Sequence, residues 1–140
     1  MVENPIYIDT NIFVYWLGKH PILGEVAYKW IKRIEESPRG RYVTSSLTLY
    51  EVLVIIAGLI GRSLKDKALI KEVINSIINL KGLVIEPLKS EDFIRALNLM
   101  EKYNLDYEDA LHLSVAIRVD AKEIISNDED FDKTPLKRTI

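Results

Sequence analysis

Four acidic residues stand where the surrounding sequence otherwise predicts a buried core. Asp9 directly follows the apolar run IYI, and Asp128 lies just after the run EIIS. Glu51 lies in LTLYEVLVIIAGLI, a stretch without Lys or Arg, and Asp109 opens the apolar segment DALHLSVAI. A buried carboxylate without a partner must raise its pKa or find a cation elsewhere. The positions of these acids therefore require a chemical explanation.

These four acids can act together on a bound cation. Two of them follow predicted strands and two lie near predicted helix starts, so all four can converge on one edge of a sheet. Carboxylates that meet there repel one another unless a counter-ion is present. Ligation by oxygen alone suits Mg²⁺ or Mn²⁺, and Mg²⁺ typically acts on phosphate oxygens. Such an ion orients and deprotonates a water molecule, which favours metal-dependent hydrolysis of a phosphate ester.

Each acid also has a purely structural interpretation. Asp9 can cap the short helix that follows it. Thr48 and Glu51 have the spacing of a capping box, and Asp106 can cap the helix that holds the third acid. The acids of SNDEDFD can be ordinary turn residues. For any one position both interpretations stay open, and the coincidence of all four favours the metal site.

The elements that must position these acids alternate along the chain. Compact runs rich in Ile and Val predict strands at 5–8, 41–44, 83–86 and 123–126, with a short edge strand from Thr134 onward. Apolar residues at helical spacing predict helices at 11–17, 22–36, 47–60, 65–80, 90–103 and 107–119. This alternation indicates an α/β fold with a mostly parallel sheet of four to five strands. Ligands of such sheets bind beyond the carboxyl ends of the strands, where Asp9 and Asp128 fall.

The composition is that of a compact globular protein. The chain has 140 residues, 48% of them apolar and 29% charged, so we expect one domain over residues 1–140. It has no cysteine, which excludes disulfides and thiolate metal sites and is compatible with a cytoplasmic location. The start carries Glu3 and no basic region, so no secretory signal is expected. The longest apolar stretch is too short to span a membrane.

The net charge does not exclude a nucleic acid as partner. The 19 basic and 21 acidic residues give −2, but if four acids bind a metal the remaining balance is 19 − 17, or +2. His112 is expected either in the core or beside a metal ligand, because no cysteine or nearby histidine completes a zinc motif.

The blocks YIDTN, LYEV, YEDALHLSVAI and SNDEDFD, in this order, resemble the PIN-domain nucleases and especially the VapC toxins of toxin-antitoxin pairs. The resemblance covers nearly the whole chain and implies a PIN-like three-layer α/β/α fold. It implies an acidic quartet that is catalytic and binds metal, formed by Asp9, Glu51, Asp109 and Asp128. Asn11 matches the position that braces the site, Ser126 the position that hydrogen-bonds a carboxylate or water, and Asp130 is a secondary candidate.

The resemblance implies hydrolysis of single-stranded RNA by a water activated by Mg²⁺ or Mn²⁺, leaving a 5′-phosphate and a 3′-hydroxyl. It also implies a homodimer and a cognate antitoxin protein that covers the acidic groove. The apolar faces of helices 47–60 and 65–80 are the expected dimer interface. An Asp-dependent phosphatase or an RNase H-like nuclease would need an acid at Asn11. The alternatives that stay open are a housekeeping PIN ribonuclease and a PIN-like module that binds RNA or protein without cutting.

Overall fold

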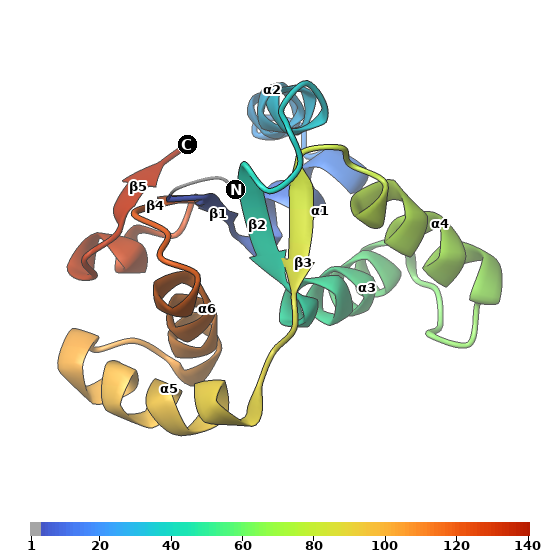
Figure 1. The fold of residues 1–140 in the computed structure, drawn as a ribbon. Coiled ribbons are helices and arrows are strands. Elements are labelled where there is room, and N and C mark those ends of the chain that lie inside the picture. The colour runs from blue at the N-terminus through green and yellow to red at the C-terminus, as the bar shows by residue number, and fades with distance from the viewer. Residues whose placement is uncertain (1–3) are drawn as a thin grey trace.

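The computed structural model describes residues 4–140 and contains a five-stranded sheet in which all neighbouring strands are parallel (Figure 1). The strands lie in the order β3-β2-β1-β4-β5. Their bounds are β1 (Ile6–Ile8), β2 (Tyr42–Ser45), β3 (Leu83–Glu86), β4 (Glu123–Ile125) and β5 (Lys137–Thr139). The predicted α/β fold with a parallel sheet, including the edge strand, is confirmed. Glu3, on which the expectation of no secretory signal rested, lies outside the described residues.

Within residues 4–140, six α-helices and one short 3₁₀ helix connect the strands. Their bounds are α1 (Thr10–Leu17), α2 (Gly24–Glu35), α3 (Ser46–Ile60), α4 (Lys67–Ile78), α5 (Ser90–Tyr103), α6 (Tyr107–Arg118) and the 3₁₀ helix η1 (Glu129–Lys133). Helices α1 to α4 cover one face of the sheet, whereas α5, α6 and η1 cover the other (Figure 1). Within the part of the chain that the structure describes, no helix is both long and apolar enough to cross a membrane.

Strand β1 belongs to both cores because its side chains alternate. Ile6 and Ile8 pack with α1 to α4, whereas Tyr7 packs with α5 and α6. Every residue of β1 is buried, as expected for the central strand of a parallel sheet covered by helices on both faces. The register pairs Ile8 with Ile125, so β1 and β4 end at the same edge of the sheet. The chain therefore delivers the residues that follow these two strands to one place.

The helix ends agree with most of the sequence expectations and correct two. Ser45 caps α3 by accepting a hydrogen bond from the N–H of Leu47, so the helix begins before Thr48 and the capping-box interpretation of Glu51 is wrong. Helix α4 ends at Ile78 and not at residue 80. Gly82 lies beyond the end of this helix, where the backbone carbonyl of Ile34 approaches it closely.

Candidate metal centre

A pocket of about 200 Å³ opens at the carboxyl ends of β1 and β4, and we call it the acidic pocket. It is lined by Asp9, Thr10, Asn11, Val14, Glu51, Ile55, Asp109, His112 and Asp128. All four acids of the predicted quartet are thus brought to one cavity, although Asp9 follows β1, Glu51 and Asp109 lie on α3 and α6, and Asp128 lies in the loop after β4. Their role as ligands stays a prediction.

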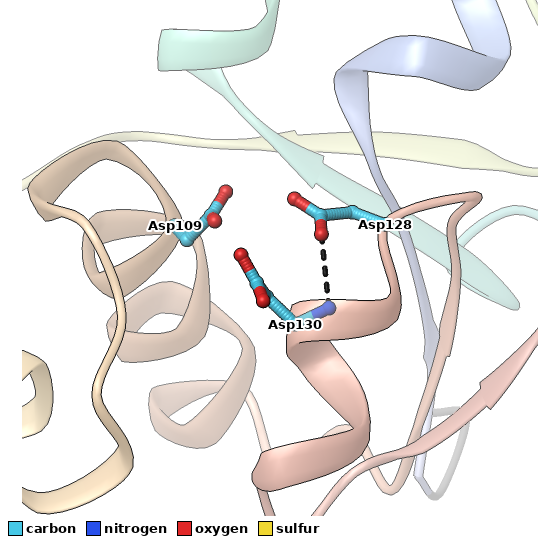
Figure 2. Close-up of side chains that lie close together, drawn as sticks. All are labelled: Asp109, Asp128 and Asp130. Carbon is cyan, nitrogen blue, oxygen red and sulfur yellow. Dashed lines mark hydrogen bonds between the residues drawn. The ribbon is translucent and has the colours of Figure 1, made fainter.

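Three carboxylates form a tighter group at one side of this pocket, which we call the acidic cluster: Asp109, Asp128 and Asp130. One carboxylate oxygen from each lies within 4.8 Å of the others. Figure 2 shows the three side chains pointing toward one another, from the first turn of α6 and from η1. Asp128 caps η1 by accepting a hydrogen bond from the N–H of Asp130 at 2.9 Å. The expected turn role of Asp128 and its place in the cluster therefore coexist.

The acidic cluster can hold a divalent metal ion. Burial, together with the negative charges of Asp128, Asp106 and Asp9, raises the pKa of Asp109 to about 8. The neighbouring carboxylates therefore disfavour the ionised form of Asp109, and a bound cation would offset this repulsion. Oxygen ligands alone suit Mg²⁺ or Mn²⁺ better than zinc or copper.

Asp9 is held from three directions at the end of β1. Its Oδ1 accepts a hydrogen bond from the N–H of Thr10 at 2.8 Å, which caps α1. Its Oδ2 accepts from the hydroxyl of Ser126 at 2.6 Å and from the amide of Asn11 at 3.2 Å. Burial raises the pKa of Asp9 despite these donors. The expected places of Asn11 and Ser126 beside a site carboxylate are thus seen, and Ser126 also accepts a hydrogen bond from the N–H of Asp128 at 3.0 Å.

Glu51 pairs with a histidine on another helix, and its own helix contains no Lys or Arg. Its Oε1 lies 2.6 Å from Nε2 of His112 on α6, and it accepts a hydrogen bond from the hydroxyl of Thr10 at 2.7 Å. Burial opposes ionisation of Glu51, but the hydrogen bonds with His112, Glu108 and Thr10 and the charge of His112 together outweigh it and lower the pKa of Glu51 to about 2. Burial likewise disfavours the imidazolium of His112, yet the tyrosine and carboxylate neighbours raise the pKa of His112 well above its usual value.

Sequence reasoning missed two residues beside Glu51. Thr10 stands in the DTN block but was not assigned a contact, and Glu108 was not singled out. The hydrogen bond with Glu51 and the negative charge of Glu51 raise the pKa of Glu108 to about 7. His112 was expected in the core or beside a metal ligand, and it is buried and contacts Glu51. The available signal was its position three residues after Asp109, which places both side chains on one face of α6.

The fold has several solved neighbours. The VapC20 toxin of Mycobacterium tuberculosis, described as cleaving the sarcin-ricin loop, is 14% identical with a TM-score of 0.71, over 91% of this chain and 92% of that chain. The VapBC2 complex of Rickettsia felis, bound to a DNA fragment from its promoter, is 20% identical with a TM-score of 0.66, over 96% of both chains. A toxin-antitoxin complex from Klebsiella pneumoniae is 22% identical with a TM-score of 0.64, over 94% of this chain and 98% of that chain.

These likenesses are too low in identity to transfer more than the fold. No curated protein was found to match the chain. A family model described as the PIN domain, however, matches residues 6–137, which is nearly the whole sequence. The chain therefore belongs to the PIN-domain family.

Proposed function

We propose that this protein is a metal-dependent endoribonuclease that cleaves single-stranded RNA, and that it is the toxin of a VapBC-type toxin-antitoxin pair. The observation that carries the proposal is the convergence of four acids from four separate segments on one pocket of a PIN domain. The crowding that raises the pKa of Asp109 to about 8 has no structural benefit for the fold, whereas a bound cation gives it a purpose.

The side chains of the pocket divide the work as follows. The acidic cluster and Asp9 hold Mg²⁺ or Mn²⁺, and Ser126 and Asn11 keep the Asp9 carboxylate turned into the pocket. Glu51, whose Oε1 is held by Thr10 and His112, completes the quartet. The ion, when bound, lowers the pKa of a water molecule and neutralises charge on the scissile phosphate.

The partner expected for a toxin is an antitoxin protein that covers the acidic pocket. A second cavity of about 380 Å³ lies beside that pocket and shares Glu51 and Ile55 with it; its other lining residues are Leu47, Tyr50, Val54 and Glu108. Its apolar wall on α3 suits an apolar protein segment better than RNA. Two of the neighbouring solved structures are toxin-antitoxin complexes, which agrees with such a partner.

A homodimer is the second expected assembly. Outside the second cavity, exposed large apolar side chains lie on α3 and on α5; they are Leu59, Ile60, Phe93, Ile94 and Leu97. Helix α4, which we expected to contribute, exposes only Ile78 among its large apolar residues. We therefore propose α3 and α5 as the dimer surface, and light scattering at micromolar concentration tests it: a monomer would remove this part of the proposal.

The nuclease proposal is tested with purified protein and labelled single-stranded RNA. We expect cleavage with Mg²⁺ or Mn²⁺, 5′-phosphate products, and loss of cleavage with EDTA, Asp9→Asn or Asp109→Asn. Asp132→Asn is the matched control, because Asp132 is an exposed acid paired with Arg138 outside the pocket. Equal cleavage by the wild type and the Asp109→Asn variant would reject the mechanism. RNA that is bound but not cut would favour the non-cleaving module.

The toxin role needs a cellular test. Induced expression of the wild type is expected to stop growth, and expression of Asp109→Asn at the same level is not. RNA 5′ ends mapped in both cultures would identify the target. If the purified enzyme cleaves RNA but its expression leaves growth and cellular RNA unchanged, the housekeeping ribonuclease is the better interpretation.

A further inference from the structure

A buried chain of hydrogen bonds runs from the core to the acidic pocket. The hydroxyl of Tyr7 lies 2.7 Å from Nδ1 of His112, and Nε2 of His112 lies 2.6 Å from Oε1 of Glu51. Tyr7 is 0% exposed and His112 is 2% exposed. The two rings meet edge to face, with centroids 5.8 Å apart. Both ring nitrogens of His112 are thus engaged, one by the core and one by a pocket carboxylate.

The partners fix how the imidazole is used. A carboxylate that is ionised can only accept hydrogen bonds, so Nε2 of His112 must carry the proton that it donates to Glu51. Nδ1 then accepts from the hydroxyl of Tyr7 when the ring is neutral, or donates to it when the ring is charged. In both states the same nitrogen faces Glu51, and the ring cannot turn without breaking two buried hydrogen bonds.

Two of the hydrogen bonds of Glu51 meet the same carboxylate oxygen. The hydroxyl of Thr10 and Nε2 of His112 both meet Oε1, at 2.7 and 2.6 Å. With Oε1 held in this way, Thr10 and His112 fix the orientation of a carboxylate that lines the acidic pocket. The chain thus has the arrangement by which outer partners commonly orient metal-binding carboxylates in proteins.

We propose that His112 is a positioning residue that holds the carboxylate of Glu51 in its metal-binding orientation, and that Tyr7 holds His112. This inference rests on the metal site of the proposed function. It gives β1 and α6 a double task, because β1 carries Tyr7 two residues before Asp9, and α6 carries His112 three residues after Asp109. Each element therefore supplies one acid of the pocket and one residue of the chain that orients Glu51.

The first test measures Mn²⁺ affinity by calorimetry on the full-length wild type and four variants. His112→Leu removes the donor and is expected to weaken Mn²⁺ binding by about 10- to 100-fold. His112→Gln keeps an amide donor near the position of Nε2 and is expected to restore most of the affinity. Tyr7→Phe is expected to weaken binding by about 3- to 10-fold, the usual effect of one lost hydrogen bond. Tyr42→Phe is the matched control, since Tyr42 is buried at the far end of the neighbouring strand.

The second test reads the histidine directly. The chain has only two histidines, so long-range ¹H–¹⁵N spectra resolve His112 from His20. We expect the ring nitrogen signals of His112 to shift in Glu51→Gln and in Tyr7→Phe, and those of His20 to stay unchanged. A histidine that only fills the core would not respond to Glu51→Gln.

The outcomes separate this inference from the nuclease proposal. If Mn²⁺ binding depends on His112 but no RNA is cut, the nuclease proposal fails and the positioning role stands. If RNA is cut, we expect His112→Leu to lower kcat with little change in KM, because the RNA contacts are untouched. Mn²⁺ affinity in Tyr7→Phe and in a folded His112→Leu equal to that of the wild type would overturn the positioning role. So would a wild type that binds no Mn²⁺ at all.

Discussion

The crowded carboxylates predict that Asp109→Asn stabilises the protein when metal is removed. The pKa of Asp109 is about 8 in the folded chain against an ordinary value of 3.8, because burial and neighbouring acids disfavour its charge. The folded chain therefore binds more protons than the unfolded chain between these two values, so stability falls as pH rises from about 4 to about 8 and then levels off. Asparagine has no charge to lose and escapes this penalty.

The size of the effect follows from the two pKa values. Their difference of about 4 corresponds to about 6 kcal/mol at about 1.4 kcal/mol per pKa unit. Asp109 is only partly buried, so screening by solvent reduces this to about 3 kcal/mol. Asp109 also lies in the first turn of α6, where loss of the charge costs about 0.5 to 1 kcal/mol of dipole interaction. The net gain is about 2 kcal/mol, or about 6 °C in Tm.

The assay is urea unfolding of wild type and Asp109→Asn in EDTA at pH 9 and at pH 4. We expect the variant to be more stable at pH 9 and the difference to vanish near pH 4. Saturating Mn²⁺ should reverse the order at pH 7.5, because at about 100 times its Kd a ligand adds about 2.7 kcal/mol to the wild type alone. Asp132→Asn, at an exposed ion pair, should show no gain at any pH. An Asp109→Asn variant that is less stable than the wild type in EDTA at pH 9 would refute the reasoning.

Three further predictions concern the scaffold that positions the pocket. Asp92 is fully buried and accepts hydrogen bonds from Arg118 on α6. Asp92→Ala should therefore lower the free energy of unfolding by about 3 kcal/mol in urea titrations. A loss below about 1 kcal/mol would contradict this prediction. The Arg118 guanidinium and other donors outweigh burial and lower the pKa of Asp92. The stability that Asp92 contributes should therefore be present above pH 4 and disappear as pH falls through the lowered pKa. A difference in stability between wild type and variant that persists at pH 2 would argue against the pairing. A Cβ at position 82 would lie 2.3 Å from the carbonyl oxygen of Ile34, so Gly82→Ala should lower the free energy of unfolding by about 2 kcal/mol. Gly58 has open space around it in α3, so Gly58→Ala should raise the free energy of unfolding by about 0.5 to 1 kcal/mol. Equal melting temperatures for the two variants would contradict the close approach at Gly82.

The residues that sequence reasoning placed well are those whose position depends on local pattern. Strand and helix periods repeat over a few residues, so the four main strands and six helices were predictable within a few residues of their bounds. Asp9 and Asp128 follow strands that run parallel, and parallel strands end at a common edge, so their meeting in one pocket was also predictable. The 3₁₀ helix η1 was missed because its acidic sequence carries no apolar period.

The errors concern contacts between distant segments. Gly82 follows α4 in the sequence, but the constraint on it comes from Ile34, which approaches from α2. Glu51 was recognised as an acid without a local cation, but its partner, His112, stands 61 residues further along the chain. Tyr7 was only a core residue in the sequence, and its contact with His112 spans 105 residues.

The sequence by itself thus determined the elements, their order, the acids at the strand ends and the family resemblance, because each depends on neighbouring residues or on a motif. Only the tertiary structure decided which acids form the acidic cluster, that Glu51 pairs with a histidine, and that Gly82 lies against a backbone carbonyl. These facts depend on how elements far apart in the sequence pack against one another, to within a few ångströms. Hydrophobic burial, which sets the local pattern, is non-directional and does not carry that information.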